Sequence, residues 1–457
     1  MTVRDTSARD LAVLALRDRG GNVSAHLERL LAREAGGPQR ALAEELTLGS
    51  IKRRLTLEAV LRAFLAQPGR KLPGALNEIL YVALYQLLFL DRIPDFAAVN
   101  EAVEQAGRFH HRRQAGLVNG ILRTVLRALG SLEEGPPPLA RDVIPVSPSS
   151  FRRLEQPIFA DPAVRPEEYL AGAASLPIEL ARRWVRRFGL ERTAELGLHA
   201  NSRPSMILRT NRLRADRQTV LDQLSAAGVA ARGHANGLSV VLDRGVNLAA
   251  LDVFARGLVQ PQDATATAVC LRAAPTADAA VLDFCAAPGT KTTHLAELMD
   301  NRGTVVAVDV SEDKLQRIIA NTVRLGIDIV KTMLADKVAS LPPASFDLVL
   351  ADVPCSNTGV LGRRAEARWH FSEHALGQLA RDQRVLIALA ANFVRPGGRL
   401  VYSTCSIEPE EGDQVAAHLT RVNPRMRLVE QELILPGGAD DPAAWHDGGY
   451  VAVFDAR

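Results

Sequence analysis

Apolar residues recur at three- and four-residue spacing in the N-terminal part of the chain, from Asp10 to about Leu132. This spacing places apolar side chains on one face of an α-helix. The clearest stripe consists of Leu76, Ile79, Leu80, Ala83, Leu84 and Leu87. Similar stripes occupy residues 11–16, 42–51 and 117–129. We therefore predict an all-helical domain over residues 1–133.

The helical pattern stops at a proline-rich stretch, EGPPPLARDVIPVSPSS, at residues 134–150. Repeated proline removes backbone donors that a helix or a central strand requires, so we expect an interdomain linker over residues 134–165. Beyond it, short β-branched runs at 206–210 and 238–242 lie on either side of a helical segment at 219–227. These runs predict a small α+β subdomain over residues 166–258.

The last part of the chain alternates apolar strands with amphipathic helices. Continuous apolar runs lie at 281–285, 304–310, 346–353 and 399–405. Strands that are apolar throughout are typical of a doubly wound parallel sheet, which helices cover on both faces. We therefore predict a Rossmann-like α/β domain over residues 259–457.

Length and composition agree with several globular domains. A chain of 457 residues exceeds what one hydrophobic core usually supports. Its 47% of hydrophobic and 23% of charged residues are ordinary for globular protein and argue against long disorder. The net charge of +3 permits a polyanionic partner but does not identify one.

Cysteine usage and the N-terminal residues predict a location in the cytoplasm. The four cysteines include no CxxC pair, so we expect neither a disulfide framework nor a bound metal. The first apolar stretch carries charges throughout, so it is not a secretory signal. No run of about eighteen apolar residues occurs, which predicts no membrane span. We expect a cytoplasmic monomer.

The loop after the first strand of the α/β domain carries small residues where a ligand can bind. It reads DFCAAPGTK from Asp283 to Lys291, and the helical TTHLAELM follows at once. Ligands of open α/β sheets bind at the carboxyl ends of the strands, and small residues let backbone amides approach them closely. Neither GxGxxG nor GxxxxGK[ST] occurs there, which weakens a nicotinamide or a nucleoside triphosphate interpretation. An ordinary βα turn is the alternative.

Acidic residues end the next two strands. Asp309 could accept hydrogen bonds from both hydroxyls of a ribose, which predicts a nucleoside-containing cofactor. It could equally stabilise the N-terminus of the helix that follows. Asp336, near the end of a strand predicted at 329–335, could reach an adenine amino group or be a solvated loop carboxylate.

Two cysteines follow neighbouring strands of the predicted sheet, Cys355 in DVPCSNTG and Cys405 in STCS. Carboxyl ends of such strands converge, so both thiols can face one small volume. The alternative is a buried structural thiol, the usual state of a free cysteine. We expect Cys270 to lie in the core and Cys285 to line the cofactor loop.

A pair of thiols suits one kind of methyl transfer. C5 of cytosine is a poor nucleophile, but addition of a thiolate to C6 makes C5 able to attack an electrophilic methyl sulfonium. Loss of the C5 proton and elimination of the thiol must follow, which makes a second thiol useful. Lys291 offers positive potential that favours a thiolate, and Asp352 could bind the cytosine N4 amino group or a protonated N3. Their alternatives are an exposed first-turn lysine and a turn cap.

Three segments together resemble a known family. DFCAAPGTKTTHLAELM, ADVPCSNTGV and YSTCSIEPEE resemble the cofactor loop, the proline-cysteine motif and the threonine-cysteine-serine motif of the bacterial ribosomal RNA cytosine-5 methyltransferases in the RsmB and NOP group. The segments LNEILYVALYQLLFLDRIPDFAAVNEAVEQA and GLVNGILRTV are similar to those of a NusB domain. The resemblance covers nearly the whole chain, in the order that the family shows.

The resemblance implies S-adenosyl-L-methionine as the cofactor, Cys405 as the nucleophile and Cys355 as the residue that assists release of the product. It implies a cofactor site built from Cys285, Ala286, Ala287, Pro288, Gly289, Thr290, Lys291, Asp309, Asp336 and Asp352. The sequence departs from the family pattern in two places. Thr290 stands where the family has a second glycine, which leaves the backbone less free, and Asp336 does not follow a glycine.

The resemblance also implies RNA as the partner, ribosomal RNA first and no DNA. Basic clusters at 52–54, 110–113, 182–183 and 186–187 could contact phosphates, and the stretch that holds Arg363, Arg364 and Arg368 resembles a basic RNA-facing segment. Solvated charged faces are the alternative. A transfer RNA cytosine-5 methyltransferase, a small-molecule methyltransferase and a non-catalytic RNA-binding adaptor are the competing functions, and the paired thiols argue against the last two.

Overall fold

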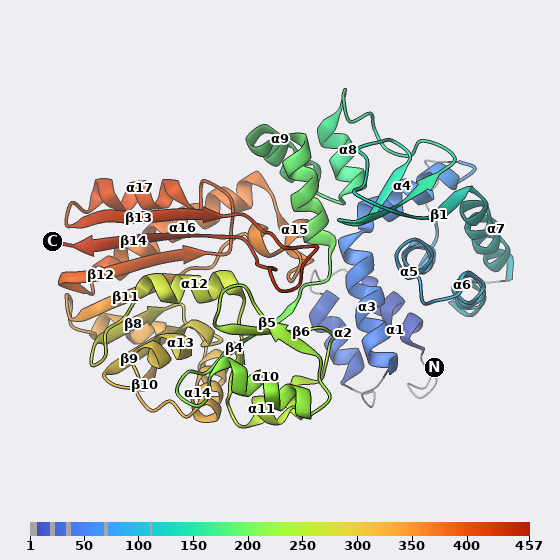
Figure 1. Cartoon of the computed structure of the whole chain (residues 1–457). Helices are drawn as coiled ribbons and strands as arrows, with labels where there is room; N and C mark the ends of the chain where they lie inside the picture. Colours follow the sequence, from blue (N-terminus) through green and yellow to red (C-terminus); the bar gives the residue numbers. More distant parts are fainter. Residues whose placement is uncertain (1–6, 19–22, 33–37, 68–71, 110–111) are drawn as a thin grey trace. The chain divides into compact units, whose positions relative to one another are not determined.

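The computed structural model describes residues 7–18, 23–32, 38–67, 72–109 and 112–457. They form two compact units, and the chain passes between them three times (Figure 1). Unit 1 contains the chain up to Ser202 together with Leu361–Phe371, and unit 2 contains Arg203–Val360 and Ser372–Arg457.

The first part of unit 1 is helical, as predicted. Its helices are α1 (Ala8–Leu16), α2 (Val23–Leu31), α3 (Pro38–Lys52), α4 (Arg54–Phe64), α5 (Leu76–Phe89), α6 (Asp95–Phe109) and α7 (Arg112–Ala128). All six residues of the clearest apolar stripe, from Leu76 to Leu87, are buried on α5. The three- and four-residue spacing therefore identified the helix that forms the centre of this core.

The stretch at 134–165, which we expected to be an interdomain linker, contains strands. It takes part in a three-stranded antiparallel sheet made of β1 (Leu129–Glu134), β2 (Val143–Ser147) and β3 (Ser150–Leu154). The strand order is β1-β3-β2, so β2, which contains Pro145, lies at an edge. An edge strand tolerates proline because one of its sides needs no backbone donor. The predicted domain boundaries themselves remain a prediction.

Unit 1 is completed by α8 (Pro166–Ala173), α9 (Ile178–Asn201) and α15 (Ala367–His370). Arg368 on α15 is fully buried, so it is neither a solvated charge nor an RNA-facing one. Its guanidinium donates to the carbonyl oxygens of Lys52 (2.8 Å), Ser175 (3.1 Å) and Ala200 (2.8 Å). A carbonyl cage can hold a buried cation that has no carboxylate partner, because charge-assisted hydrogen bonds are strong.

The basic cluster at 52–54 is likewise mostly structural. Lys52 is 8% exposed and Arg53 is 4% exposed, and Arg53 donates to the carbonyl oxygens of Pro145 and Val146, both at 2.8 Å. Only Arg54 of the three is exposed. The side chains of the cluster at 110–113 lie outside the described residues, while Arg182, Arg186 and Arg187 are exposed.

Unit 2 begins with the predicted small α+β part. Its four-stranded sheet has the order β5-β6-β4-β7, and α10 packs on β5 and β6. The elements are β4 (Met206–Thr210), α10 (Arg217–Ala226), β5 (Ala231–Gly233), β6 (Ser239–Leu242), η2 (Leu248–Ala250), α11 (Asp252–Ala255) and β7 (Val259–Pro261).

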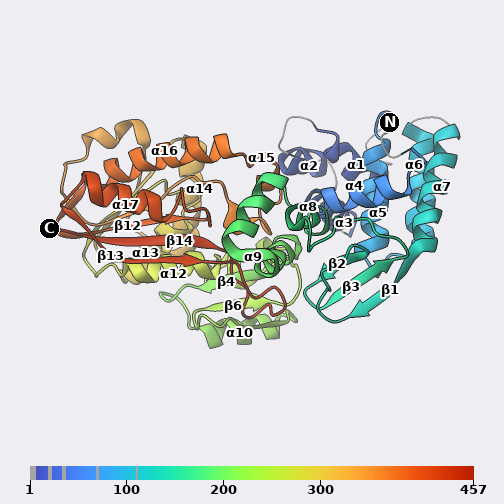
Figure 2. The same cartoon turned by 90° about the horizontal axis from the view of Figure 1, so that it is seen from above.

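A seven-stranded sheet of order β10-β9-β8-β11-β12-β14-β13 forms the larger part of unit 2 (Figures 1 and 2). The strands are β8 (Ala280–Phe284), β9 (Thr304–Asp309), β10 (Val330–Leu334), β11 (Phe346–Asp352), β12 (Val394–Thr404), β13 (Met426–Ile434) and β14 (Gly449–Ala456). The first five are parallel, as predicted, whereas β14 is antiparallel to both neighbours. No helix joins β13 to β14, and a connection without a crossover helix suits antiparallel pairing.

Helices cover both faces of this sheet: α12 (Ala264–Ala273) and α13 (Thr290–Leu298) on one, and α16 (Glu373–Ala391) and α17 (Asp413–Val422) on the other. Along β11, Leu348 and Leu350 enter the first core, and Val349 and Ala351 enter the second. Alternating residues point to opposite faces, which explains why the strand is apolar throughout. No helix in the described ranges is long and apolar enough to cross a membrane.

Candidate active site

The small-residue loop leads from β8 into α13 through a backbone that few residue types can adopt. Cys285 has φ +70° and Gly289, which caps α13, has φ +92°. A Cβ on Gly289 would lie 3.1 Å from Ile318 Cγ2, so this position needs glycine. Thr290 is the first residue of α13. Thr290, which stands where the family has a second glycine, therefore lies at a helical position that accepts a side chain.

Asp309 closes this loop from the end of β9. Its Oδ2 accepts a hydrogen bond from the Ala287 amide (3.0 Å), and its Oδ1 lies 3.2 Å from Lys314 Nζ. The residue is 6% exposed, and a carboxylate has lone pairs to spare for further donors. Asp336 differs, because it is exposed at the start of η3 (Ala335–Ser340). No hydrogen bond or ion pair joins it to the other described site residues.

Asp283, inside the same motif, was not singled out from the sequence. It is 1% exposed, its Oδ2 accepts a 2.5 Å hydrogen bond from Thr292, and its Oδ1 has no partner among the described residues. Burial raises the pKa of Asp283 to about 7. The available signal was an acidic residue inside an otherwise apolar strand, VLDFC.

Lys291 and Asp352 form an ion pair between the start of α13 and the end of β11, with Nζ and Oδ2 2.6 Å apart. Ser403 of β12 donates to the other oxygen, Oδ1, at 2.7 Å. Burial opposes a charge on Lys291, but the Asp352 carboxylate outweighs it and raises the lysine pKa. Lys291 and Asp352, which the sequence predicted as separate site residues, thus form one charged pair. Lys291 is therefore not the exposed first-turn lysine that was the alternative.

Cys355 and Cys405 lie side by side, with their sulfur atoms 3.0 Å apart. The Cys405 thiol also donates to Asn357 Oδ1 at 3.2 Å. The hydrogen bond to Cys405, followed by burial, raises the pKa of Cys355 well above its usual range. The expected convergence of two strand-end thiols is therefore present.

The other two cysteines are placed differently. Cys270 is fully buried on α12, as expected, and burial raises its pKa to about 12. Cys285 lies in the loop after β8 and is partly exposed, and burial, followed by the Asp352 charge, raises its pKa to about 12. Neither thiol lies at the strand ends that carry Cys355 and Cys405.

Glu411 and Gln383 hold the Cys355 loop, although sequence reasoning assigned neither. The fully buried Glu411 accepts a hydrogen bond from the Ser356 amide at 2.9 Å. Gln383 donates to Glu411 Oε1 (2.8 Å) and to the Pro354 carbonyl (2.9 Å). Glu411 ends the YSTCSIEPEE motif, so its presence there was the only signal.

A cavity of about 90 Å³ opens beside Cys405, Lys291 and Asp352. Asp263, Thr265 and Asp447 also line it, and Thr265 Oγ1 donates to the Asp447 carbonyl at 2.6 Å. The cavity therefore brings a thiol, an ammonium group and several oxygen acceptors to one place.

The seven-stranded sheet, the small-residue loop at its first strand and the acid at its second define the chain as an S-adenosylmethionine-dependent methyltransferase with a Rossmann-like fold. A family model described as "16S rRNA methyltransferase RsmB/F" matches residues 270–441. A NusB family model matches residues 6–127, and a model for the RsmF/B-like ferredoxin-like domain matches residues 177–249. The predicted cofactor class and fold class are thereby confirmed.

Curated relatives extend this match over most of the chain. A protein of Bacillus subtilis (strain 168) is 33% identical over 422 residues, 90% of this chain and 88% of its own. The ribosomal RNA small subunit methyltransferase B of Sodalis glossinidius (strain morsitans) is 33% identical over 89% of this chain and 87% of its own. The chain belongs to the ribosomal RNA small subunit methyltransferase B family.

Solved structures share the fold at lower identity. The protein PH0851 aligns with a TM-score of 0.72 and 22% identity over 98% of this chain and 97% of its own. NSun6 from Pyrococcus horikoshii, solved with SFG, aligns with a TM-score of 0.52 and 22% identity over 61% of this chain and 98% of its own.

Proposed function

We propose that this methyltransferase methylates C5 of a cytosine in small-subunit ribosomal RNA through a covalent bond from Cys405 to C6. The observation that carries the proposal is the pair of sulfur atoms 3.0 Å apart, beside the Lys291–Asp352 ion pair. Direct transfer to nitrogen or oxygen needs no thiol. The relatives named ribosomal RNA small subunit methyltransferase B support the choice of substrate.

The residues at the strand ends fit the cofactor that this class uses. Gly289 brings the loop backbone close to its neighbours, and Asp309 has unused lone pairs for a ribose. We assign the cofactor site to Cys285, Ala286, Ala287, Pro288, Gly289, Thr290, Lys291, Asp309 and Asp352, with Asp336 at its adenine end. S-adenosylmethionine supplies a methyl carbon made electrophilic by its sulfonium sulfur.

Cys405 starts the reaction as a nucleophile. The Cys405 thiol, which donates to Asn357 Oδ1 at 3.2 Å, loses its proton to solvent, and the Lys291 ammonium favours the resulting thiolate. The sulfur bonds to C6, and the electron pair of the C5–C6 bond makes C5 nucleophilic. Asp352 holds Lys291 in place and offers its remaining lone pairs to the cytosine N4 amino group.

Cys355 ends the reaction as a base. Its raised pKa keeps it a thiol while Cys405 is free. Once Cys405 is a thioether, it can carry no negative charge, so the pKa of Cys355 falls. Cys355 can then lose its proton to solvent and take the proton from C5. The C6–sulfur bond breaks, and Cys405 leaves as a thiolate.

The target base must be unpaired or extruded, because a stacked cytosine cannot present C6 to a thiol. We expect the protein to act in the cytoplasm as a monomer, on RNA and not on DNA. We assign an RNA-contacting role to unit 1, whose residues 6–127 match the NusB family, because the family resemblance implies RNA as the partner.

Trapping the covalent intermediate tests the mechanism. Cys405→Ala should lose methyl transfer and give no adduct, whereas Cys355→Ala should accumulate an RNA–protein complex that survives denaturing electrophoresis. The matched control is Cys270→Ala, which removes a core thiol. This variant should keep methyl transfer and should not accumulate an adduct. An adduct with Cys405→Ala and none with Cys355→Ala would reverse the two roles.

Bisulfite sequencing of total RNA from cells with and without the protein identifies the substrate. We expect one small-subunit ribosomal cytosine to lose protection when the protein is absent. A change in a transfer RNA instead would assign the competing substrate, and no change in any cytosine would favour the non-catalytic adaptor.

A further inference from the structure

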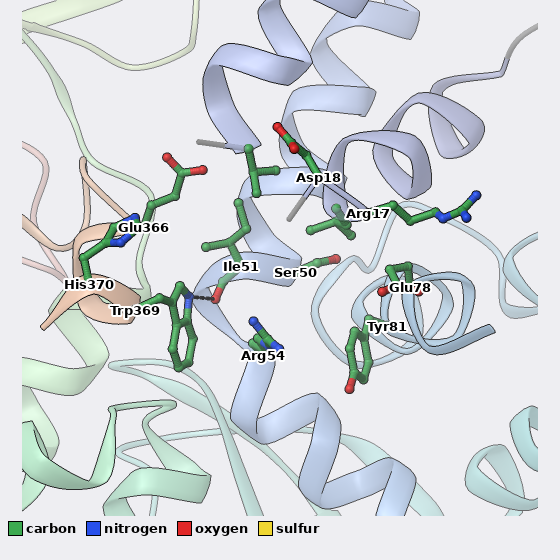
Figure 3. A pocket seen from close by; sticks show the side chains of 12 residues that line it. Arg17, Asp18, Ser50, Ile51, Arg54, Glu78, Tyr81, Glu366, Trp369 and His370 are labelled. Atoms are coloured by element: carbon green, nitrogen blue, oxygen red, sulfur yellow. Dashed lines mark hydrogen bonds between the residues drawn. The ribbon is translucent and has the colours of Figure 1, made fainter. Parts of the chain in front are cut away.

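Unit 1 contains a cavity of about 470 Å³ that the proposed methyl transfer does not use. Residues of α3, α5 and α15, the first residue of α4, and residues around the end of α1 and the start of α2 line it (Figure 3). Small-molecule sites usually measure roughly 300–1,000 Å³, so the cavity has room for one nucleotide.

Aromatic side chains form part of its wall. Trp369 on α15 and Tyr81 on α5 both line it. The Trp369 indole donates to the Ile51 carbonyl at 3.2 Å, and the Arg54 guanidinium lies 5.6 Å from the Trp369 ring centroid. These contacts fix the plane of the indole, and nucleobases stack on such rings and on guanidinium planes.

Two oxygen atoms of the wall have no hydrogen-bond partner within the described part of the chain, Ser50 Oγ and Glu78 Oε2. Ser50 is 2% exposed. Figure 3 shows its hydroxyl on the side of α3 that faces Glu78 and Tyr81 of α5. Buried polar atoms are nearly always paired, so these two indicate a ligand that donates hydrogen bonds.

Charged side chains of both signs line the cavity, and some of the carboxylates already have partners within the protein. Asp18 pairs with His26 at 3.2 Å, and Glu366 Oε1 accepts from the Ser24 amide at 2.9 Å, so both carboxylates already have partners. Arg17 and Arg54 line the cavity and are exposed, and Arg54 also pairs with Glu58 at 3.1 Å. Their guanidinium groups can bind the phosphate of a nucleotide, and the Glu78 carboxylate can then accept hydrogen bonds from its base.

We propose that this cavity binds one unpaired guanosine nucleotide of an RNA, held by Glu78, Ser50 and Trp369. Guanine presents N1–H and the N2 amino group side by side, and a carboxylate can accept from both. Adenine and cytosine place a ring acceptor beside their amino group, and uracil offers one N–H between two carbonyls. RNA as the source of the nucleotide rests on the proposed function, whereas the preference for guanine does not.

Tryptophan fluorescence of the full chain, without S-adenosylmethionine, tests the preference. Trp184 and Trp445 are each 1% exposed, so Trp369 should dominate quenching by a bound base, and Trp369→Phe should remove the signal. We expect GMP to bind about tenfold or more tightly than AMP, CMP or UMP. Equal affinity for GMP and AMP would overturn the proposal.

Glu78→Gln, which keeps shape and removes the charge, should weaken GMP about tenfold or more. Glu104→Gln changes an exposed carboxylate of α6 outside the cavity and should leave binding unchanged. Arg17→Ala, on the surface, should reduce the affinity for GMP toward that for guanosine. If Glu78→Gln does not fold, as judged by its thermal melt, Ser50→Ala replaces it. GMP affinity unaffected by any of these variants would overturn the assignment.

Single-stranded RNA separates the two sources of the nucleotide. A short oligonucleotide with one guanosine should bind at least as tightly as GMP and lose about tenfold when inosine, which lacks the N2 amino group, replaces guanosine. Binding of GMP without binding of the oligonucleotide would overturn RNA as the source. Methyl transfer is not measured, so a failure of the cytosine-5 mechanism would leave these results unchanged.

Discussion

The polar groups beside the paired thiols of unit 2 and the polar groups at Ser50 and Glu78 in the cavity of unit 1 differ in whether the protein itself supplies their hydrogen-bond partners, although Asp283 of unit 2 also keeps one oxygen without a partner among the described residues. In unit 2, Asp352 is paired with Lys291 through one oxygen and with Ser403 through the other, and Glu411 accepts from the Ser356 amide. In unit 1, Ser50 and Glu78 each leave an oxygen without a partner among the described residues.

The difference follows from what each site has to do. A catalytic group acts only when it is held in place before the substrate arrives, so its neighbours must be satisfied within the protein. A binding cavity gains affinity and selectivity from groups whose partners are supplied by the ligand. Partnered groups should therefore be costly to remove in the absence of ligand, and unpartnered ones should not.

The largest expected effect is that of Lys291→Met. Loss of the ammonium leaves Asp352 without its ion-pair partner and removes the positive charge that favours the Cys405 thiolate. We expect single-turnover methyl transfer to fall about 10²–10³-fold. Lys337→Met, at an exposed position of η3, is the control and should be within twofold of the parent. Near-normal transfer by Lys291→Met would show that this pair is structural only.

Arg368→Met should have the next largest effect, on stability. Methionine fills much of the volume but leaves the carbonyl oxygens of Lys52, Ser175 and Ala200 without their donor. We expect a loss of about 3 kcal/mol from the unit 1 transition in urea. Arg123→Met, on the exposed side of α7, should change it by less than about 0.5 kcal/mol. Equal losses for the two variants would contradict a carbonyl cage.

Asp283 should make stability depend on pH. Because burial raises its pKa to about 7, the folded state binds a proton that the unfolded state loses at lower pH, and stability falls as pH rises through 7. Asp283→Asn lacks this dependence. Between pH 5 and 8, the parent should lose about 2 kcal/mol relative to this variant in urea unfolding. Parallel pH profiles would show that Asp283 titrates normally.

The sequence predicted those parts of the fold that a local pattern determines. Apolar runs gave β8, β9 and β11 within one residue of their ends. The stripe gave six buried residues of α5, but Val82, Tyr85 and Leu88 on its other sides are buried as well, so the helix does not have the single buried face that the stripe predicted. The prolines at 134–150 gave no sign of β2, because proline excludes only central strands, and β2 is an edge strand. A run of residues does not reveal which strand will be an edge.

Charged side chains were harder to predict than apolar ones. Arg53 and Arg368 look like parts of basic clusters, but both bind carbonyl oxygens inside unit 1. In the active site, strand-end position predicted that Cys355 and Cys405 meet. Gln383, on α16, could not be inferred in the same way, because its contact with Glu411 depends on how a helix packs on the sheet.

The smallest expected effect compares two buried serines, Ser403 at 1% and Ser50 at 2% exposure. Ser403→Ala removes a donor to the charged Asp352 and should cost about 1–2 kcal/mol of stability. Ser50→Ala removes a hydroxyl without a partner and should be neutral or stabilising by about 0.5 kcal/mol, helped by the helix propensity of alanine.

Urea unfolding measures the stability change of both variants. Equal costs would mean that the Ser50 hydroxyl already has a partner, and the contrast between the two sites would be lost. Saturating GMP should stabilise the parent more than Ser50→Ala, and it should leave the cost of Ser403→Ala unchanged.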